Sequence, residues 1–214
     1  MSYHPVIKDM QKHLRKIKNP KVLEIGIDTG ATFFVLAHSL TLLHDDFKLM
    51  GIDIFLNPNV RVMISNWEVP SKVKNSNPGV TDVIELQEIN SLDYLKDENN
   101  FCEYDLILLD GDHNYYTVSR ELEMLHKNFT KVGSAMIIDD YRGKWSKKDM
   151  WYVEGDQGIA SDCATKKIET EKHGVASAVD DFMDRHCDSW VMRDIPLDYG
   201  RATAESVLLQ RKSK

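Results

Sequence analysis

The stretch Lys21–Thr32, with the sequence KVLEIGIDTGAT, constrains the fold of this chain more than any other. The apolar run Val22–Ile25 breaks at Gly26 and Gly30, and a helical pattern follows over Ala31–Leu43. This order predicts a strand, a tight turn and a helix. Glycine suits such a turn because a residue without Cβ adopts positive φ and lets a ligand approach the main chain. The N–H groups that open the helix then face a negative group.

The spacing of the two glycines narrows the choice of ligand. Dinucleotide-binding turns have the form G-x-G-x-x-G, whereas three residues separate Gly26 from Gly30, and Glu24 stands two positions before the first glycine. This form resembles the first motif of class I S-adenosylmethionine (SAM) dependent methyltransferases, E/D-x-G-x-x-x-G. The resemblance implies that both glycines pass under the methionine part of SAM, with Glu24 near its ammonium group and Thr32 near its carboxylate. An ordinary strand-to-helix turn is the alternative.

Composition and charge exclude several classes of protein. With 214 residues, 42% of them hydrophobic, the chain suits one α/β domain. A net charge of -7 and a pI of about 5.6 argue against a nucleic-acid substrate. The three cysteines lack C-x-x-C spacing, so neither a disulfide framework nor a zinc site is indicated. No apolar run reaches the roughly 18 residues of a membrane span, and the N-terminus lacks an apolar signal core. We expect a cytoplasmic protein that binds no membrane.

The rest of the chain predicts alternating strands and helices. We expect a helix over 4–18, strands at 47–54, 83–89, 106–109 and 134–138, helices at 92–98, 116–129 and 175–186, and final strands at 190–195 and 206–210. The expected fold is a single domain over 1–214, α/β, with a Rossmann-like, doubly wound seven-stranded sheet. This sheet is mostly parallel with an antiparallel C-terminal strand, in the order 3-2-1-4-5-7-6.

Two long connections interrupt this pattern. Residues 55–79 are rich in Asn and Pro and contain a short apolar patch and Trp67, which either walls a substrate pocket or packs on the surface. Residues 141–173 show no sustained periodicity, and we interpret them as a lid or substrate loop, with a partly disordered insertion as the alternative.

Polar residues stand where the second and third strands end. In Rossmann-like folds a carboxylate at the end of the second strand accepts hydrogen bonds from ribose hydroxyls. We assign this role to Asp53, with Ile54 beside it. The resemblance to SAM-dependent methyltransferases places Asn90 and Ser91, which follow the third strand, beside the adenine.

Carboxylates gather after the next two strands. Asp110, Asp112 and His113 follow the apolar run 106–109, and Asp139 and Asp140 follow the run 134–138. Because open α/β sheets bind ligands at the carboxyl ends of their strands, these acids meet at the ligand-binding edge. A divalent cation would offset their repulsion, and oxygen ligands without thiolates favour Mg²⁺, Mn²⁺ or Ca²⁺ over zinc. A salt-bridged cluster without metal is the alternative.

The pairing of D-G-D-H-x-Y after one strand with I-I-D-D-Y after the next resembles the metal-dependent small-molecule O-methyltransferases of the macrocin type (methyltransferase domain family 24). Catechol and caffeoyl-CoA O-methyltransferases are more distant kin, and the match covers about Lys21–Asp184. The resemblance implies that Asp110, Asp139 and Asp140 hold the metal. Catechol-type enzymes have a basic lysine three positions after the first metal acid, where this chain has His113. Histidine accepts protons near neutral pH; helix capping is the alternative role.

These motifs predict a SAM-dependent O-methyltransferase acting on a hydroxyl of a small molecule such as a sugar, a polyketide or a catechol-like diol. The methyl group of SAM is already activated, so the protein need only align an acceptor oxygen and make it more nucleophilic. Bound Mg²⁺ would orient that oxygen and lower its pKa. His113 and Asp110 are the catalytic candidates, Asp110 is also a candidate cofactor-binding residue, and Asp112 either orients His113 or lies at the adenine side.

Other functions remain open at this point. They are a cephalosporin-hydroxylase-like relative, a metal-dependent hydrolase that leaves the glycine motif unused, and a catalytically silent SAM-binding or partner-binding domain. A homodimer through the first helix is an expectation from the family.

Overall fold

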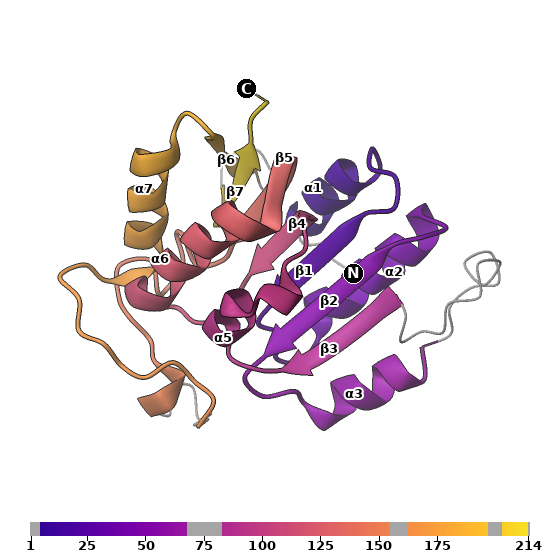
Figure 1. Ribbon diagram of the computed structural model, residues 1–214, viewed down its shortest axis with the longest axis horizontal. Helices are drawn as coiled ribbons and strands as arrows, with labels where there is room; N and C mark the ends of the chain where they lie inside the picture. Colours follow the sequence, from indigo (N-terminus) through magenta and orange to yellow (C-terminus); the bar gives the residue numbers. More distant parts are fainter. Residues whose placement is uncertain (1–4, 68–82, 155–161, 197–202, 214) are drawn as a thin grey trace.

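A seven-stranded sheet forms the centre of the computed structural model, which describes residues 5–67, 83–154, 162–196 and 203–213 (Figure 1). Its strand order is β3-β2-β1-β4-β5-β7-β6. Strands β1 to β5 pair in parallel, and β7 runs antiparallel to both β5 and β6. The predicted fold class and strand order are therefore confirmed. The strands are β1 (Lys21–Ile25), β2 (Lys48–Asp53), β3 (Ile84–Glu88), β4 (Tyr104–Leu109), β5 (Thr130–Ile138), β6 (Trp190–Pro196) and β7 (Thr203–Arg211).

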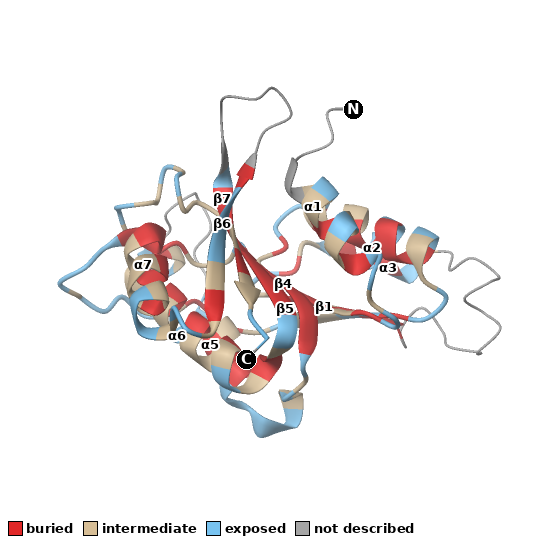
Figure 2. Cartoon of the chain, turned by 90° about the horizontal axis from the view of Figure 1, so that it is seen from above, coloured by how far each residue is buried: buried red, intermediate tan, exposed pale blue. Residues whose placement is uncertain are grey.

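Helices cover both faces of the sheet, which is the middle layer of three in Figure 2. One face carries α1 (Pro5–Leu14), α2 (Ala31–Leu43) and α3 (Pro58–Ser65). The other carries α5 (Ser91–Lys96), α6 (Tyr115–Met124) and α7 (Gly174–His186). A π-helical turn, η3 (Leu125–Phe129), ends α6, and short 3₁₀ turns form η2 (Glu98–Asn100) and η4 (Tyr152–Glu154).

The alternation of side chains along the strands builds two hydrophobic cores. In β4, Leu106 and Leu108 join the core under α1, α2 and α3, whereas Ile107 and Leu109 join the core under α5, α6 and α7. All six residues of β4 are buried. An unbroken apolar run is what a parallel strand covered on both faces requires, so the sequence pattern and the position of β4 agree.

The N-terminal helix α1 packs against its own chain. Met10 and Leu14 are buried in the core beside α2, and the Gln11 side-chain amide donates to the Ser39 hydroxyl at 2.9 Å. The apolar stripe of α1 is therefore used within the chain. A homodimer through this helix would have to use its outer face.

The connection after β2 contains a short helix, α3, which begins with Pro58 and is capped by the Asn57 side chain. Trp67 follows it and stacks on Phe34, with ring centroids 6.1 Å apart, against the core of the α1, α2 and α3 face. This contact matches the packed-aromatic interpretation of Trp67. Residues 68–79 of the predicted connection lie outside the described residues.

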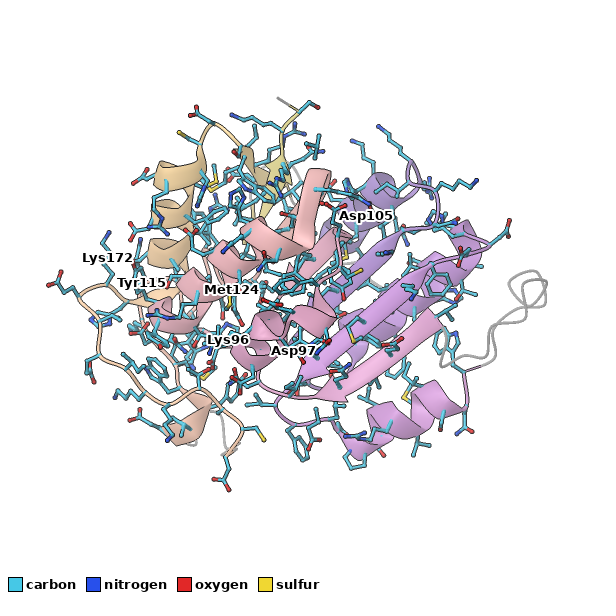
Figure 3. The ribbon with its side chains drawn as sticks, viewed as in Figure 1. Lys96, Asp97, Asp105, Tyr115, Met124 and Lys172 are labelled. Atoms are coloured by element: carbon cyan, nitrogen blue, oxygen red, sulfur yellow. The ribbon has the colours of Figure 1, made fainter. Side chains whose placement is uncertain are left out.

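Hydrogen bonds connect the described parts of the 141–173 segment to α6 and α7. One oxygen of Asp149 accepts the backbone N–H groups of Tyr115 and Gly174, each at 2.8 Å, so a single carboxylate serves the first turns of both helices. Tyr115 and Lys172, which lie near each other in Figure 3, both donate to the Asp181 carboxylate. These contacts place the segment beside the carboxyl ends of the strands.

No helix among the described residues is long and apolar enough to cross a membrane.

Candidate active site

A cavity of about 300 Å³ lies at the carboxyl ends of β1, β2, β3 and β4. Its walls are the loops that follow these strands, together with η4 from the 141–173 segment. The structure brings nine of the ten predicted cofactor residues into this wall, and Gly30 is the exception. The nine are Glu24, Gly26, Thr32, Asp53, Ile54, Asn90, Ser91, Asp110 and Asp112.

The two glycines of the β1 turn are required by packing. Both have positive φ, 87° at Gly26 and 80° at Gly30. A Cβ added to Gly26 would lie 2.1 Å from the carbonyl oxygen of Asp110, and one added to Gly30 would lie 2.7 Å from the ring of Phe34. The absence of a side chain at Gly26 thus lets the loops after β1 and β4 meet at the cavity wall. The absence of a side chain at Gly30 leaves room for the ring of Phe34 in the first turn of α2.

Asp53 ties the β1 turn to the end of β2. Its Oδ2 accepts the N–H groups of Ile27 at 2.6 Å and Asp28 at 3.0 Å, and its Oδ1 accepts that of Phe55 at 2.9 Å. A carboxylate offers about four acceptor positions, so about one remains for a ligand hydroxyl. The three backbone bonds hold the carboxylate in a fixed orientation at the cavity wall.

Glu24 is a buried acid with an unsatisfied oxygen. The residue is 2% exposed, and its Oε2 has no hydrogen-bond partner among the described residues. Burial, followed by the nearby charges of Asp110 and Asp53, raises the pKa of Glu24 well above its ordinary value. Because buried polar atoms normally have partners, this oxygen indicates a ligand group that donates a hydrogen bond from within the cavity.

The cavity wall carries acids without matching bases. Its acidic residues are Glu24, Asp28, Asp53, Asp110 and Asp112, and none of the described lining residues is Lys, Arg or His. An excess of carboxylates in a partly enclosed space favours a ligand with positive charge.

The Asn90 side chain is committed to two structural contacts. Its Oδ1 accepts the N–H of Leu92 at the start of α5, and its Nδ2 donates to the Cys163 carbonyl at 3.0 Å and the Thr165 hydroxyl at 3.1 Å. Thr165 also forms a hydrogen bond with Asp112. Burial raises the pKa of Asp112 to about 6, although this and other hydrogen bonds act to lower it. Thr165 therefore links two of the predicted adenine-side residues. Sequence reasoning missed it because its segment has no motif or periodicity.

The acids that follow β4 and β5 meet as predicted from the order of the strands. Burial, then Asp139 and Asp140, raise the pKa of Asp110 to about 8, with a hydrogen bond between Asp110 and Asp139 contributing. Burial and Asp139 also raise the pKa of Asp140 to about 6. Asp139 accepts a hydrogen bond from Ser206 of β7. Among the described residues, however, no three His, Cys, Asp or Glu side chains are arranged to hold a metal ion.

His113 lies behind Asp110, outside the cavity wall. Its Nε2 is 4.0 Å from Asp110 Oδ1, and its Nδ1 is 3.4 Å from Asp140 Oδ2. Burial lowers its pKa to about 4, only partly opposed by Asp139, so the imidazole is neutral at pH 7. The structure thus brings both predicted catalytic residues near each other, with Asp110 in the cavity wall and His113 beside it, outside the wall.

Tyr152 of η4 lines the cavity, and no sequence motif distinguishes it from the other aromatic residues of its segment. Its segment was expected to form a lid or substrate loop, and two other aromatic residues flank the same region. Trp151 is 3% exposed and belongs to the interior, and Trp145 packs under Lys144 at 4.2 Å. Only tertiary contacts distinguish Tyr152 from these neighbours.

A family model described as a methyltransferase domain (Methyltransf_24) matches residues 23–141, more than half of the chain. No curated protein gave a significant sequence match.

Three solved structures share the fold. An O-methyltransferase from Bacillus cereus in complex with S-adenosylhomocysteine (SAH) is 15% identical, with a TM-score of 0.56 over 100% of this chain and 83% of that one. TomG from Streptomyces achromogenes, an O-methyltransferase of tomaymycin synthesis in complex with SAM, is 16% identical, with a TM-score of 0.57 over 100% and 82%. A TDP-rhamnose 3′-O-methyltransferase of calicheamicin biosynthesis is 13% identical, with a TM-score of 0.55 over 96% and 76%.

These identities show the fold, and the family model shows the family. The glycine turn, the acid that ends β2 and the acid that ends β4 all lie within the matched residues and surround one cavity. The chain belongs to the methyltransferase domain family Methyltransf_24 and is a class I, SAM-dependent methyltransferase.

Proposed function

We propose that this methyltransferase transfers the methyl group of SAM to a hydroxyl of a small molecule such as a sugar, a polyketide or a catechol-like diol. The observation that carries the proposal is the acid-lined cavity at the carboxyl ends of the strands, with its unsatisfied Glu24 oxygen. SAM carries a sulfonium and an ammonium group, and both suit such a cavity. The similar solved structures include O-methyltransferases, one of which acts on a TDP-linked sugar.

In this proposal, different cavity residues contact different parts of the cofactor. Glu24 receives the ammonium group, Thr32 the carboxylate and Asp53 the ribose. Asn90 and Ser91 flank the adenine. Because the donors of the Asn90 amide are already used, Asn90 does not donate to the adenine and instead holds the 162–173 segment beside it.

Methyl transfer requires an acceptor oxygen in line with the activated methyl group and a group that removes its proton. Asp110 faces the cavity and His113 lies behind it, so Asp110 is the nearer of the two to the reacting atoms. We assign the acceptor proton to this pair of groups, with Asp110 at the cavity surface and His113 on its interior side, 4.0 Å away. Asp112, bonded to Thr117 and Thr165, fixes the adjoining loop.

The proposal also includes a divalent cation. Asp110, Asp139 and Asp140 offer the hard oxygen donors that Mg²⁺, Mn²⁺ or Ca²⁺ prefer. Their arrangement in the described chain does not form a ready metal centre, and Asp110 and Asp139 share a hydrogen bond instead. A bound cation would polarise the acceptor oxygen. The assignment of the proton to Asp110 and His113 does not depend on it.

The first test is calorimetric titration of the purified protein with SAH, once with Mg²⁺ and once with EDTA. We expect binding in both conditions. Asp53→Ala should weaken SAH binding at least about tenfold, because a hydrogen-bonded carboxylate at the ribose is lost. Asp46→Ala, at an exposed acid before β2, is the matched control. No binding of SAH by the wild-type protein would overturn the proposal.

A second test separates cofactor binding from turnover. His113→Ala should lower kcat on diol-bearing acceptors about 10²-fold or more, the range of a lost acid–base group, while SAH affinity stays within a factor of two. Asp139→Ala and Asp140→Ala should also spare SAH binding and should abolish any turnover that EDTA removes. If these variants lose SAH binding as Asp53→Ala does, the division between cofactor and acceptor residues is wrong.

A further inference from the structure

One residue of the cavity wall comes from outside the loops that build it. Of the described lining residues, all but Tyr152 belong to the ends of β1 to β4 and the loops and first turn that follow them. Tyr152 reaches the cavity from the connection between β5 and α7. Nothing in the shared strand-turn-helix pattern requires an aromatic ring at this place.

The chain before and after Tyr152 holds it over the cavity. Met150 and Trp151 are 1% and 3% exposed, and the backbone N–H of Met150 donates to the carbonyl of His113 at 3.2 Å. On the other side, Glu154 pairs with Lys167 at 3.1 Å. Tyr152 therefore sits between a buried anchor and an ion pair, and its position is fixed by contacts other than its own.

Acids that line the cavity act electrostatically on the hydroxyl of Tyr152. Its pKa is raised above the ordinary value by burial, then by Asp112, Asp110, Asp53 and Asp28. The phenol is neutral throughout the physiological range, so it adds no charge to the cavity. Tyr152 lines the same cavity as Asp53, the acid assigned to the ribose, and Asp110, the acid assigned to the reacting centre.

We propose that Tyr152 is a cofactor-contacting residue whose ring lies against the sulfonium end of SAM and favours the charged cofactor over the uncharged product. This inference rests on the proposed function. An aromatic face attracts a cation such as a sulfonium, and it has no such attraction for the thioether of SAH. The surrounding carboxylates act in the same direction, so loss of the methyl group weakens binding and promotes product release.

The experiment compares two non-reactive ligands by calorimetry. SAH represents the uncharged sulfur, and sinefungin carries a protonated amine where SAM has its methylated sulfonium. For Tyr152→Ala we expect sinefungin affinity to fall about tenfold and SAH affinity to fall less than about threefold. Tyr152→Phe, which keeps the ring, should bind both ligands within about twofold of the wild type.

The neighbouring Val153 provides the matched control, since it is 37% exposed in the same short turn and does not line the cavity. Val153→Ala should leave both affinities unchanged, and thermal melting of each variant checks that it is folded. Unchanged affinities in Tyr152→Ala, or an equal fall for both ligands, would overturn the inference while the proposed function stands. A wild-type protein that binds neither ligand would overturn both.

Discussion

At the scale of single residues, Glu121 gives the protein a pH dependence that its surface charges do not explain. It is 1% exposed on α6, accepts a hydrogen bond from Ser91, and has one oxygen without a partner among the described residues. Burial raises its pKa from 4.5 to about 8. The folded state therefore binds a proton that the unfolded state releases, and stability is lost as the pH rises from about 4.5 to about 8, by on the order of 4 kcal/mol.

Glu121→Gln keeps the shape of the neutral acid, so we expect this variant to gain stability relative to the wild type as the pH rises from 5 to 8. Urea denaturation at pH 5, 6.5 and 8 measures the difference. Glu123→Gln is the control. Hydrogen bonds from Arg185 and His186 outweigh burial there and lower the pKa of Glu123 below its ordinary value of 4.5, so its contribution is lost only below about pH 4.5 and the difference from the wild type should stay constant from pH 5 to 8. A pH-independent difference for Glu121→Gln would contradict the assignment.

At the scale of elements, Asp149 joins two helices and the 141–173 segment. Its carboxylate serves the first N–H groups of α6 and α7 and contacts His173 Nδ1 at 2.7 Å. Two helix-terminal hydrogen bonds are lost in Asp149→Ala, so we expect a loss of about 2 kcal/mol in the free energy of unfolding, from about 1 kcal/mol for each bond. Asp149→Asn keeps the accepting oxygen and should lose less than half as much. Equal losses for the two variants in urea denaturation would show that the charge, and not the shared acceptor, matters.

The elements that the sequence predicted well are those with a clear period. The helix expected over 31–43 has the observed bounds of α2, and each expected strand overlaps a strand of the sheet. The acids at the strand ends followed from the same pattern, because the strand order alone brings Asp110 and Asp139 together. The contributions of Tyr152, Thr165 and Asp149 could not be predicted in this way. Their segment lacks periodicity, and contacts to distant residues determine where each side chain lies.

Other site details also depend on tertiary packing. At Gly30, the contact that requires a glycine is a local one with Phe34 in the first turn of α2, together with Val60 of α3. At Asn90, the sequence predicted a position beside the adenine but not the hydrogen bonds of the amide to Cys163 and Thr165. These two partners come from a segment whose position only the folded chain determines.

At the scale of the whole molecule, the cavity gathers residues from both halves of the sheet. Its wall includes Asp53 after β2 and Asp110 after β4, and Tyr152 adds the segment after β5. A cofactor bound there contacts every one of these parts only in the folded state, so its binding free energy should stabilise the chain as one unit. At a SAH concentration 100 times the Kd, the gain is about 2.7 kcal/mol. For a chain of this size we expect Tm to rise by about 5 to 10 °C.

Two probes test whether the rise is shared by the whole chain. Far-UV circular dichroism reports on all helices and strands. Fluorescence of a Trp67→Phe variant reports only on Trp145, Trp151 and Trp190, which all follow β5. We expect both probes to give the same Tm with SAH, because Tyr152 and the strand ends would contact the same bound cofactor. A rise seen by circular dichroism alone would mean that the chain after β5 melts independently of the cofactor, and Tyr152 would then not be part of its site.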